Sequence, residues 1–466
     1  MTARTPSSST PRRSVLVLTD DVLASSMAGP AIRAWNIAEV LSEHHDVRLA
    51  STVRSEASSP RFAVCDGTPE RLRGIAEGQE VIVVQGFTLA KHPWLASLGA
   101  RLVVDLYDPI HLEILEMAKE ESPARRAEML QASVRALHTQ VAQGDFFLAA
   151  SERQRDLWLG HLAAWGRVND ATYQQDPTLR SLVDVAPFGI PRDDATTTSP
   201  ALRGTIPGIG ADDLVLLWGG GVYNWFDPVT LVRAVAGLRD AAGPTPVRLV
   251  FMGTTHPSLD DPDTAALREA VATAAELGVL DTHVFFVEGW VPYAQRADFL
   301  LDADIGVSTH LDHVETAFSF RTRMLDYLWA GLPIVCTEGD TFAELVARHD
   351  LGRVVPPRDP AALARAIGEL LDPAVRAACT SRIVEVREQF RWDVALRPLV
   401  SYCGQAARAA DLATGTRAVG TGAALGGRVD DLVGDVRRYV AVNGWKRLLR
   451  RAGQLAWQRS RTLTRL

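Results

Sequence analysis

Two arginines and an acid lie close together in the segment RTRMLDYLWAGLPIV, at Arg321, Arg323 and Asp326. Guanidinium groups present forked N–H donors that match the oxygens of a diphosphate. A carboxylate accepts hydrogen bonds, so Asp326 can receive the two hydroxyl groups of a pentose. The spacing therefore predicts a site for a phosphorylated ligand that carries hydroxyl groups. The alternative is a solvated basic loop followed by an acid that only stabilises the first turn of a helix.

Three consecutive glycines, Gly219, Gly220 and Gly221, directly follow the apolar run LVLLW. Glycine lets a backbone come close to a phosphate and bind it through N–H groups. The segment lacks the GxGxxG fingerprint of dinucleotide-binding folds, which argues against a nicotinamide oxidoreductase. The glycines fit a phosphate cradle and a plain turn equally well.

A second turn segment, EGWVP, follows another apolar run in the same half of the chain. The backbone of Gly289, Trp290 and Val291 is predicted to hydrogen-bond a base, with Trp290 or Pro292 beside the ring. A tryptophan at such a rim otherwise serves for packing.

The first half of the chain also places small and polar residues after strand-like runs. Gly29, Pro30 and Arg33 follow the run SVLVLT, and Asp108 and His111 follow RLVVDLY. Because ligands of doubly wound sheets bind outside the carboxyl ends of the strands, these residues are candidates for a second binding surface.

Two series of elements must position these groups. Short Val/Ile/Leu-rich runs alternate with amphipathic helix-length segments in both halves of the chain, which predicts an α/β protein with two doubly wound parallel sheets. A helix is predicted to start near Thr322 and to end at Gly331, just before Pro333. The predicted segments are a disordered leader (1–13), a first domain (14–195), a second domain (212–388), a closing helix (389–408), a flexible linker (409–427) and a basic amphipathic tail (428–466).

Composition and length limit the class of protein. A chain of 466 residues exceeds the size of a single core, and its 47% hydrophobic and 23% charged residues are typical of a globular protein. No apolar run reaches the length of a membrane span. The four cysteines are scattered without metal-ligand spacing, which indicates a reducing, cytoplasmic compartment and predicts no metal site.

The end of the chain differs in charge from the rest. Residues 437–466 hold nine Arg or Lys and no Asp or Glu, although the whole chain carries a net charge of −7. A helix of this kind can lie on an anionic membrane surface. The alternatives are a basic helix docked on the acidic body and a disordered tail.

Taken in order, these motifs resemble those of the family 4 glycosyltransferases over most of residues 14–405. The segments that carry the resemblance are MAGPAIRAWNIAEVL, LAASERQRDLW, VAPFGIP, LLWGGG, LVFMGTT, VFFVEGWVP, LDYLWAGLPIV, FAELV and GRVVPPRDPAALARAI. The resemblance implies the GT-B architecture, in which two Rossmann-like domains face each other across a cleft. It also implies a nucleotide-diphosphate sugar held by the second domain, an acceptor held by the first, and transfer with retention of configuration.

Matched residue by residue, Asp326 corresponds to the second acid of the family's Glu-x7-Glu motif, which holds the nucleotide ribose. Phe318 stands where the first acid would be, and the nearest carboxylate is Glu315. Arg323 stands where one branch of the family has a lysine. The Arg/Lys pair that many relatives carry after the glycine loop is absent, so Arg321 and Arg323 are predicted to supply that charge.

The resemblance assigns a role to each candidate residue. The implied donor-binding residues are Gly219, Gly220, Gly221, Gly289, Trp290, Val291, Glu315 and Asp326; the implied catalytic residues are Asp108, His111, Arg321 and Arg323; and the implied acceptor-binding residues are Gly29, Pro30 and Arg33.

No cofactor is expected, and since no Asp-x-Asp motif stands at the predicted donor site, transfer is predicted to be independent of metal. The expected partners are a nucleotide-sugar donor, a glycan or lipid-linked acceptor for a cell-surface polysaccharide, and an anionic membrane surface bound by residues 437–466 on the inner face of the cell membrane. No nucleic acid is expected. A sugar-nucleotide epimerase or hydrolase of the same architecture and a non-catalytic scaffold remain as alternatives.

Overall fold

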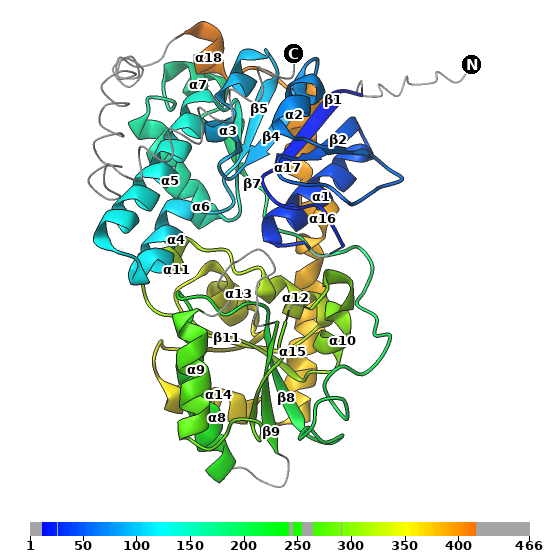
Figure 1. Cartoon of the computed structure of the whole chain (residues 1–466), viewed down its shortest axis with the longest axis vertical. Helices are drawn as coiled ribbons and strands as arrows, with labels where there is room; N and C mark the ends of the chain where they lie inside the picture. Colours follow the sequence, from blue (N-terminus) through cyan, green and yellow to red (C-terminus); the bar gives the residue numbers. More distant parts are fainter. Residues whose placement is uncertain (1–11, 26, 242–245, 254–263, 290, 416–466) are drawn as a thin grey trace, which may run out of the picture.

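A computed structural model describes residues 12–25, 27–241, 246–253, 264–289 and 291–415 of the chain. These residues form two lobes stacked along the long axis of the molecule, with residues of the first half in the upper lobe and those of the second half in the lower lobe (Figure 1). Each lobe is built around one parallel sheet that helices cover on its faces.

The first lobe contains a seven-stranded sheet in the order β3-β2-β1-β4-β5-β6-β7, and every recorded pair of strands in it is parallel. Its strands are β1 (Ser14–Thr19), β2 (Asp46–Ser51), β3 (Ala63–Asp66), β4 (Val81–Gln85), β5 (Arg101–Asp105), β6 (Phe146–Ala149) and β7 (Val183–Val185). Its helices are α1 (Gly29–Ser42), α2 (Pro69–Ala76), α3 (Thr88–Lys91), η1 (Pro93–Ser97), α4 (Ile110–Met117), η2 (Ala118–Glu120), α5 (Pro123–Gln143), α6 (Glu152–Ala164) and α7 (Asp170–Gln175).

The second lobe contains a six-stranded parallel sheet in the order β10-β9-β8-β11-β12-β13. Its strands are β8 (Leu214–Gly219), β9 (Val247–Met252), β10 (Val284–Phe286), β11 (Ile305–Ser308), β12 (Ile334–Thr337) and β13 (Gly352–Val355). Its helices are α8 (Pro228–Ala241), α9 (Ala265–Glu276), η3 (Tyr293–Gln295), α10 (Arg296–Leu301), α11 (Val314–Phe318), α12 (Arg323–Ala330), α13 (Thr341–His349), α14 (Pro360–Glu369) and α15 (Pro373–Val386). The strand order is that of a doubly wound fold, with its switch point between β8 and β11.

Both sheets form where the apolar runs predicted strands, because apolar residues can be buried on both faces of a sheet. All five residues of β4 and all six of β8 are buried, as expected for parallel strands covered on both faces. The two sheets fall inside the predicted ranges 14–195 and 212–388.

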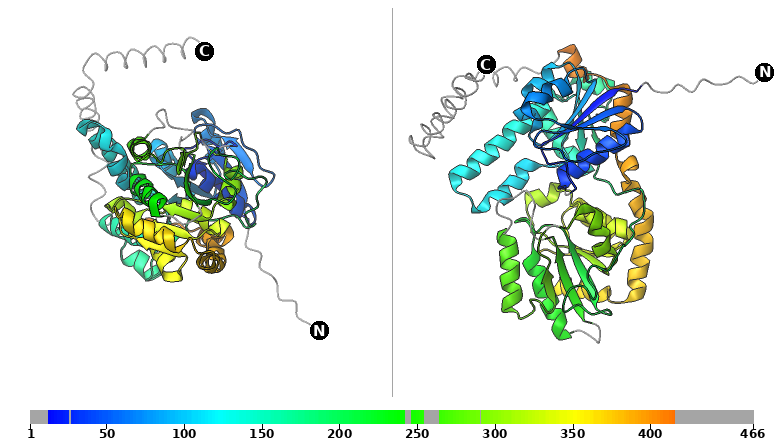
Figure 2. Two further views of the ribbon diagram at one scale, coloured as in Figure 1. Left: turned by 90° about the horizontal axis from the view of Figure 1, so that it is seen from below. Right: turned by 45° about the vertical axis from the view of Figure 1, so that its right-hand side comes forward.

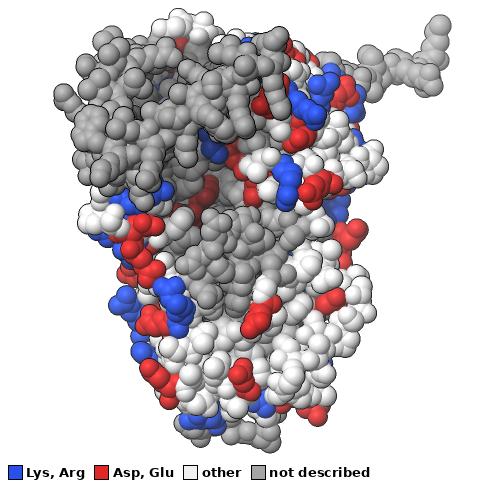
Figure 3. All heavy atoms as spheres, viewed as in Figure 1, with Lys and Arg blue, Asp and Glu red and all other residues white. Residues whose placement is uncertain are grey.

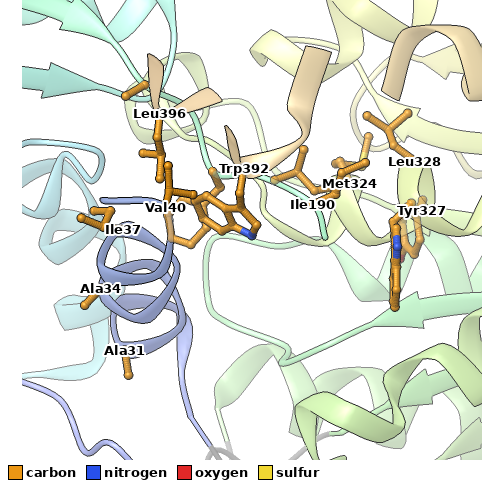
Figure 4. Packing of buried hydrophobic residues seen from close by; sticks show 14 of the residues in the cluster. Ala31, Ala34, Ile37, Val40, Ile190, Met324, Tyr327, Leu328, Trp392 and Leu396 are labelled. Atoms are coloured by element: carbon orange, nitrogen blue, oxygen red, sulfur yellow. The ribbon is translucent and has the colours of Figure 1, made fainter. Parts of the chain in front are cut away.

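The chain crosses between the lobes twice, and the two crossings hydrogen-bond to each other. The amide of Ile190 donates to the carbonyl of Phe390 (2.7 Å), and that of Trp392 donates to the carbonyl of Ile190 (3.1 Å). A Cβ at Gly189 would lie 2.6 Å from a ring carbon of Trp392, so only glycine lets the two segments pack this closely. Figure 4 shows apolar side chains running continuously from α1 through this hinge to α12.

The last described helices return to the first lobe. The predicted closing helix is η4 (Arg387–Phe390) followed by two pieces, α16 (Trp392–Ala395) and α17 (Arg397–Gln405), and these run from the lower lobe to the upper one (Figures 1 and 2). Tyr402 of α17 stacks on Phe146 of β6, with ring centroids 4.4 Å apart. The helix therefore joins the lobes instead of only closing the second domain.

Two predicted boundaries are wrong. Residues 409–415 belong to a packed element and not to a flexible linker, because α18 (Ala410–Thr414) buries Asp411 in an ion pair with Arg167. At the other end, Arg12 bonds Asp46 and the carbonyl of His45, so the predicted leader extends at least two residues too far. Residues 1–11 and 416–466, and with them the predicted basic tail, lie outside the described residues.

No helix in the described part of the chain is long and apolar enough to cross a membrane.

Candidate active site

The lobes meet where α6 of the first approaches α11 and α13 of the second. The side-chain amide of Gln154 donates to the carbonyls of Tyr107 (2.9 Å) and Phe318 (2.8 Å). Arg153 donates to the carbonyl of Gly339 (2.7 Å) and pairs with Glu344. The surface is hollowed between the lobes (Figure 3). Gln154 and Arg153 therefore join the two lobes beside this hollow.

Arg323 lies beside the glycine turn in this region. Its Nη2 donates to the carbonyl of Gly221 (2.6 Å), and its guanidinium carbon lies 4.2 Å and 4.1 Å from the ring centroids of Trp218 and Phe226. The side chain is buried, its Nη1 has no partner, and no carboxylate among the described residues pairs with it. Burial lowers the pKa of Arg323 to about 10. An unpaired buried cation is costly, so this position favours an anionic ligand.

The glycine turn offers fewer N–H donors than a three-residue cradle would. The amide of Gly219 donates to the hydroxyl of Tyr327 (2.8 Å), and that of Gly220 donates to the carbonyl of Met252 (3.1 Å). The amide of Gly221 has no recorded partner among the described residues. Gly220 has φ +108°, which an L side chain rarely adopts. Among the described residues, only the Gly221 amide of this turn is therefore open to a phosphate, and the phosphate-binding role of the turn stays a prediction.

Arg321 is neutralised within the lobe. Its Nη1 and Nη2 donate to the two carboxylate oxygens of Glu315 at 2.8 Å and 2.6 Å, and Glu315 is completely buried. Glu315 consequently cannot contact a donor as predicted; it holds Arg321 in place. The Nε of Arg321 is buried and has no partner among the described residues.

Asp326 lies in the first turn of α12, which begins at Arg323 and ends at Gly331 with φ +73°, as the sequence predicts. Its side chain is 28% exposed, and its Oδ1 lies 3.0 Å from the Nε of Arg296. Arg296 was not predicted, since nothing in its local sequence marks it. Asp326 lies three residues after Arg323 on the same helix, and its charge acts on that guanidinium.

The predicted base-contacting loop lies beside the end of β9. A Cβ at Gly253 would lie 3.7 Å from the amide of Val291 and 3.9 Å from the carbonyl of Gly289. Gly289 is exposed and Val291 packs against the core. Trp290 lies outside the described residues.

The first lobe contributes a pair of carboxyl groups. The side chains of Asp108 and Glu113 hydrogen-bond to each other, and burial raises the pKa of Asp108 to about 6. Burial also raises the pKa of Glu113 well above its usual value, and the charge of Asp108 adds to that shift. Glu315 and Arg321 act on both acids, so the pair faces the second lobe. Glu113 was missed because it lies five residues from Asp108, a spacing that marks no motif.

Two predicted residues of the first lobe do not reach this site. The ring of His111 packs on those of Trp158 and His161 in α6, with centroids 5.9 Å and 5.5 Å away, and burial lowers its pKa to about 4. His111 therefore packs within the first lobe, and the catalytic role predicted for it stays a prediction.

Arg33 is fully buried and bonds Asp105 through two contacts of 2.6 Å and 2.8 Å. It also donates to the carbonyls of Ala186 and Pro187. The acceptor-binding role predicted for Arg33 is wrong, because Asp105 neutralises its buried guanidinium and two backbone carbonyls accept its other N–H groups. Gly29 and Pro30 are partly exposed at the start of α1.

No group of three His, Cys, Asp or Glu residues in the described ranges is arranged to hold a metal ion. Independence of metal stays a prediction.

Residues 213–373 match the family model described as Glycosyl transferases group 1. Two curated relatives are similar to parts of the chain. A phosphatidyl-myo-inositol mannosyltransferase of Mycolicibacterium smegmatis is 32% identical over 120 residues, which cover 26% of this chain and 30% of the relative. A D-inositol 3-phosphate glycosyltransferase of Acidothermus cellulolyticus is 30% identical over 193 residues, which cover 40% of each chain. The matches thus span less than half the length of these relatives.

Among solved structures, HepE of Anabaena in complex with UDP and glucose superimposes with a TM-score of 0.60 at 15% identity, over 85% of this chain and 100% of that one. Together with the two parallel sheets, this likeness establishes the GT-B fold.

Proposed function

We propose that this chain is a glycosyltransferase that moves a sugar from a nucleotide-diphosphate sugar to a hydroxyl group of an acceptor. The observation that carries the proposal is the buried guanidinium of Arg323 beside the glycine turn at Gly221, because no carboxylate among the described residues pairs with it. A diphosphate supplies the charge that this arrangement lacks, and the match of residues 213–373 to a glycosyltransferase family supports the same ligand.

The second lobe binds the donor. Arg323 and the Gly221 amide contact the diphosphate, with the Nε of Arg321 as a further donor. Asp326 accepts the ribose hydroxyls through its exposed carboxylate, and the loop at Gly289 and Val291 lies beside the base. The Anabaena neighbour, solved with UDP and glucose, supports a nucleotide sugar as the donor.

The chemical step creates negative charge on the leaving diphosphate. The bond between the anomeric carbon and the phosphate oxygen breaks, the acceptor oxygen bonds that carbon, and the acceptor proton passes to the departing phosphate oxygen. Preorganised guanidinium and amide donors stabilise this charge without rearranging. Attack on the face from which the diphosphate leaves retains the anomeric configuration.

The first lobe binds the acceptor and sugar hydroxyl groups. Asp108 and Glu113 share a hydrogen bond at the face of the second lobe, so the pair offers both an acceptor oxygen and a proton donor to hydroxyl groups. The contacts of Gln154 and Arg153 hold the lobes together, which excludes water that would hydrolyse the donor.

A lipid-linked or cell-surface glycan intermediate is the proposed acceptor. One curated relative is named a phosphatidyl-myo-inositol mannosyltransferase, and the basic segment 437–466 suits an anionic membrane on the cytoplasmic side. Deletion of residues 428–466 is expected to shift the protein from the membrane fraction to the supernatant. An unchanged distribution would remove this part of the proposal.

The deciding experiment supplies a panel of labelled sugar nucleotides with and without acceptor lipid. Product that forms only with acceptor supports transfer. Free sugar or an isomerised nucleotide formed without acceptor identifies a hydrolase or an epimerase. A thermal-shift panel of nucleoside diphosphates and their sugar conjugates accompanies it, because a ligand of the folded state raises its apparent stability. The absence of both turnover and binding would leave the non-catalytic scaffold.

A further inference from the structure

Arg296 is held rigidly beside Asp326. Its guanidinium carbon lies 3.5 Å from the ring centroid of Tyr293 and 4.3 Å from that of Trp329. Its Nη1 donates to the carbonyl of Tyr293 (2.7 Å), and its side chain is only 8% exposed. Contacts on aromatic rings together with a backbone bond fix the plane of this guanidinium, as the flat guanidinium shape allows.

The same guanidinium fixes one oxygen of the donor-site acid. The Nε of Arg296 donates to the Oδ1 of Asp326 (3.0 Å), while Oδ2 has no partner among the described residues. The acid is partly exposed, whereas the arginine is buried. One carboxylate oxygen is therefore anchored and the other is available to a ligand.

The position of Trp329 ties this arrangement to the hinge. Its Nε1 donates to the carbonyl of Asp193 in the segment between the lobes (2.8 Å), and its carbonyl accepts from Arg387 (2.8 Å). These two hydrogen bonds hold Trp329 independently of Arg296, and the guanidinium of Arg296 packs against its ring. Arg296, which bonds Asp326, therefore packs on a ring that is itself hydrogen-bonded to the hinge.

We propose that Arg296 is a positioning residue for the donor nucleotide, which holds Asp326 so that its free oxygen meets the hydroxyl groups of the pentose. The inference rests on the proposed function, in which Asp326 accepts the ribose hydroxyls, and adds Arg296 as the residue that orients this acid. Lysine at position 296 keeps the charge but loses the planar contact, so it restores the orientation only in part.

The test compares each ribonucleoside diphosphate with its 2′-deoxy counterpart by calorimetry, using ADP, GDP, UDP and CDP to find the base that binds best. The variants are Arg296→Gln, Arg296→Lys and Asp326→Asn in the full-length chain. Arg248→Lys is the matched control, because its Nε also bonds one carboxylate oxygen, that of Asp213 (2.6 Å), at the opposite end of β9. Thermal unfolding without ligand verifies that each variant is folded.

The wild type is expected to bind the ribonucleotide about tenfold more tightly than the deoxynucleotide, as for a hydrogen bond to a charged group. Arg296→Gln and Asp326→Asn should reduce this preference to about twofold or less, Arg296→Lys should give an intermediate ratio, and Arg248→Lys should keep the wild-type ratio. The double variant Arg296→Gln/Asp326→Asn should show no further loss.

If Arg296→Gln lowers the affinities for the ribonucleotide and the deoxynucleotide by the same factor, the inference is overturned and Arg296 is a purely structural residue. If Asp326→Asn abolishes the preference while Arg296→Gln preserves it, the acid is positioned without the arginine. Failure of the wild type to bind any nucleoside diphosphate would overturn the proposed function, and this inference with it.

Discussion

Each lobe buries an arginine against aromatic rings, yet the two arginines are balanced in opposite ways. In the first lobe, Arg33 lies 5.1 Å from the ring centroid of Tyr107 and 5.0 Å from that of Phe188, and it bonds both oxygens of Asp105. In the second lobe, Arg323 has similar aromatic neighbours but bonds one carbonyl and no described carboxylate. The aromatic setting therefore does not distinguish a structural arginine from a binding one.

The difference lies in where the compensating charge resides. The fold itself supplies the anion for Arg33, which is Asp105, so the Arg33 guanidinium has no unbalanced charge to attract a ligand. For Arg323 the fold supplies only π-electron density and a carbonyl, which offset part of the cost of burying the cation. Loss of the first arginine leaves a buried acid alone, whereas loss of the second leaves no buried charge behind.

The largest effect is expected from Arg33→Met. Asp105 would remain buried without its partner, so the free energy of unfolding should fall by about 3–5 kcal/mol. Urea unfolding followed by tryptophan fluorescence measures the loss. The double variant Arg33→Met/Asp105→Leu should recover much of it, and a loss of less than about 1 kcal/mol in the single variant would contradict the contrast between the two arginines.

Arg323→Gln should act on binding instead of stability. We expect the affinity for the best nucleoside diphosphate to fall about 100-fold, because a charge-assisted contact to phosphate is lost, while the unliganded protein stays as stable as the wild type or becomes more stable. Calorimetry and thermal unfolding without ligand give the two values. A destabilisation as large as that of Arg33→Met would show that the guanidinium is needed by the fold.

The comparison extends to two acids three residues apart, since Asp105 is paired with Arg33 while Asp108 bonds another acid. Burial raises the pKa of Asp108 from 3.8 to about 6, so the folded protein keeps this proton to a higher pH than the unfolded chain does. The stability that it contributes is present below about pH 4 and is lost as the pH rises through 6. Asp108→Asn should match the wild type near pH 4 and exceed its stability by on the order of 1 kcal/mol near pH 7.5. A difference that does not change with pH in urea unfolding would refute the raised pKa.

The smallest effect is expected at Arg353, an arginine whose ion pair lies at the surface. Arg353 pairs with Glu369 (2.5 Å), and these side chains are 27% and 59% exposed. Arg353→Ala should cost less than about 1 kcal/mol, and the loss should shrink in high salt because exposed pairs are screened. The free energy of unfolding, measured at two salt concentrations, tests this. A salt-independent loss of several kcal/mol would mean that side-chain exposure does not explain the different effects expected at Arg33, Arg323 and Arg353.

Much of the architecture follows from local patterns. Apolar runs such as LVLLW become buried parallel strands, and α12 ends at Gly331, where a left-handed residue is needed. The sequence also predicted Arg323 and Asp326 at the start of one helix. These features depend on periodicity and backbone conformation over a few neighbouring residues, which the chain order displays directly.

Tertiary structure decided which charges are free. Arg33 meets an acid 72 residues away and Arg296 meets one 30 residues away, and neither pairing leaves a mark in the local sequence. The sequence by itself therefore determined the two sheets and the candidate groups between them. Only the folded chain determined that Arg33 is neutralised and Arg323 is not, because the energy of a buried charge depends on the distant groups that folding brings within a few ångströms of it.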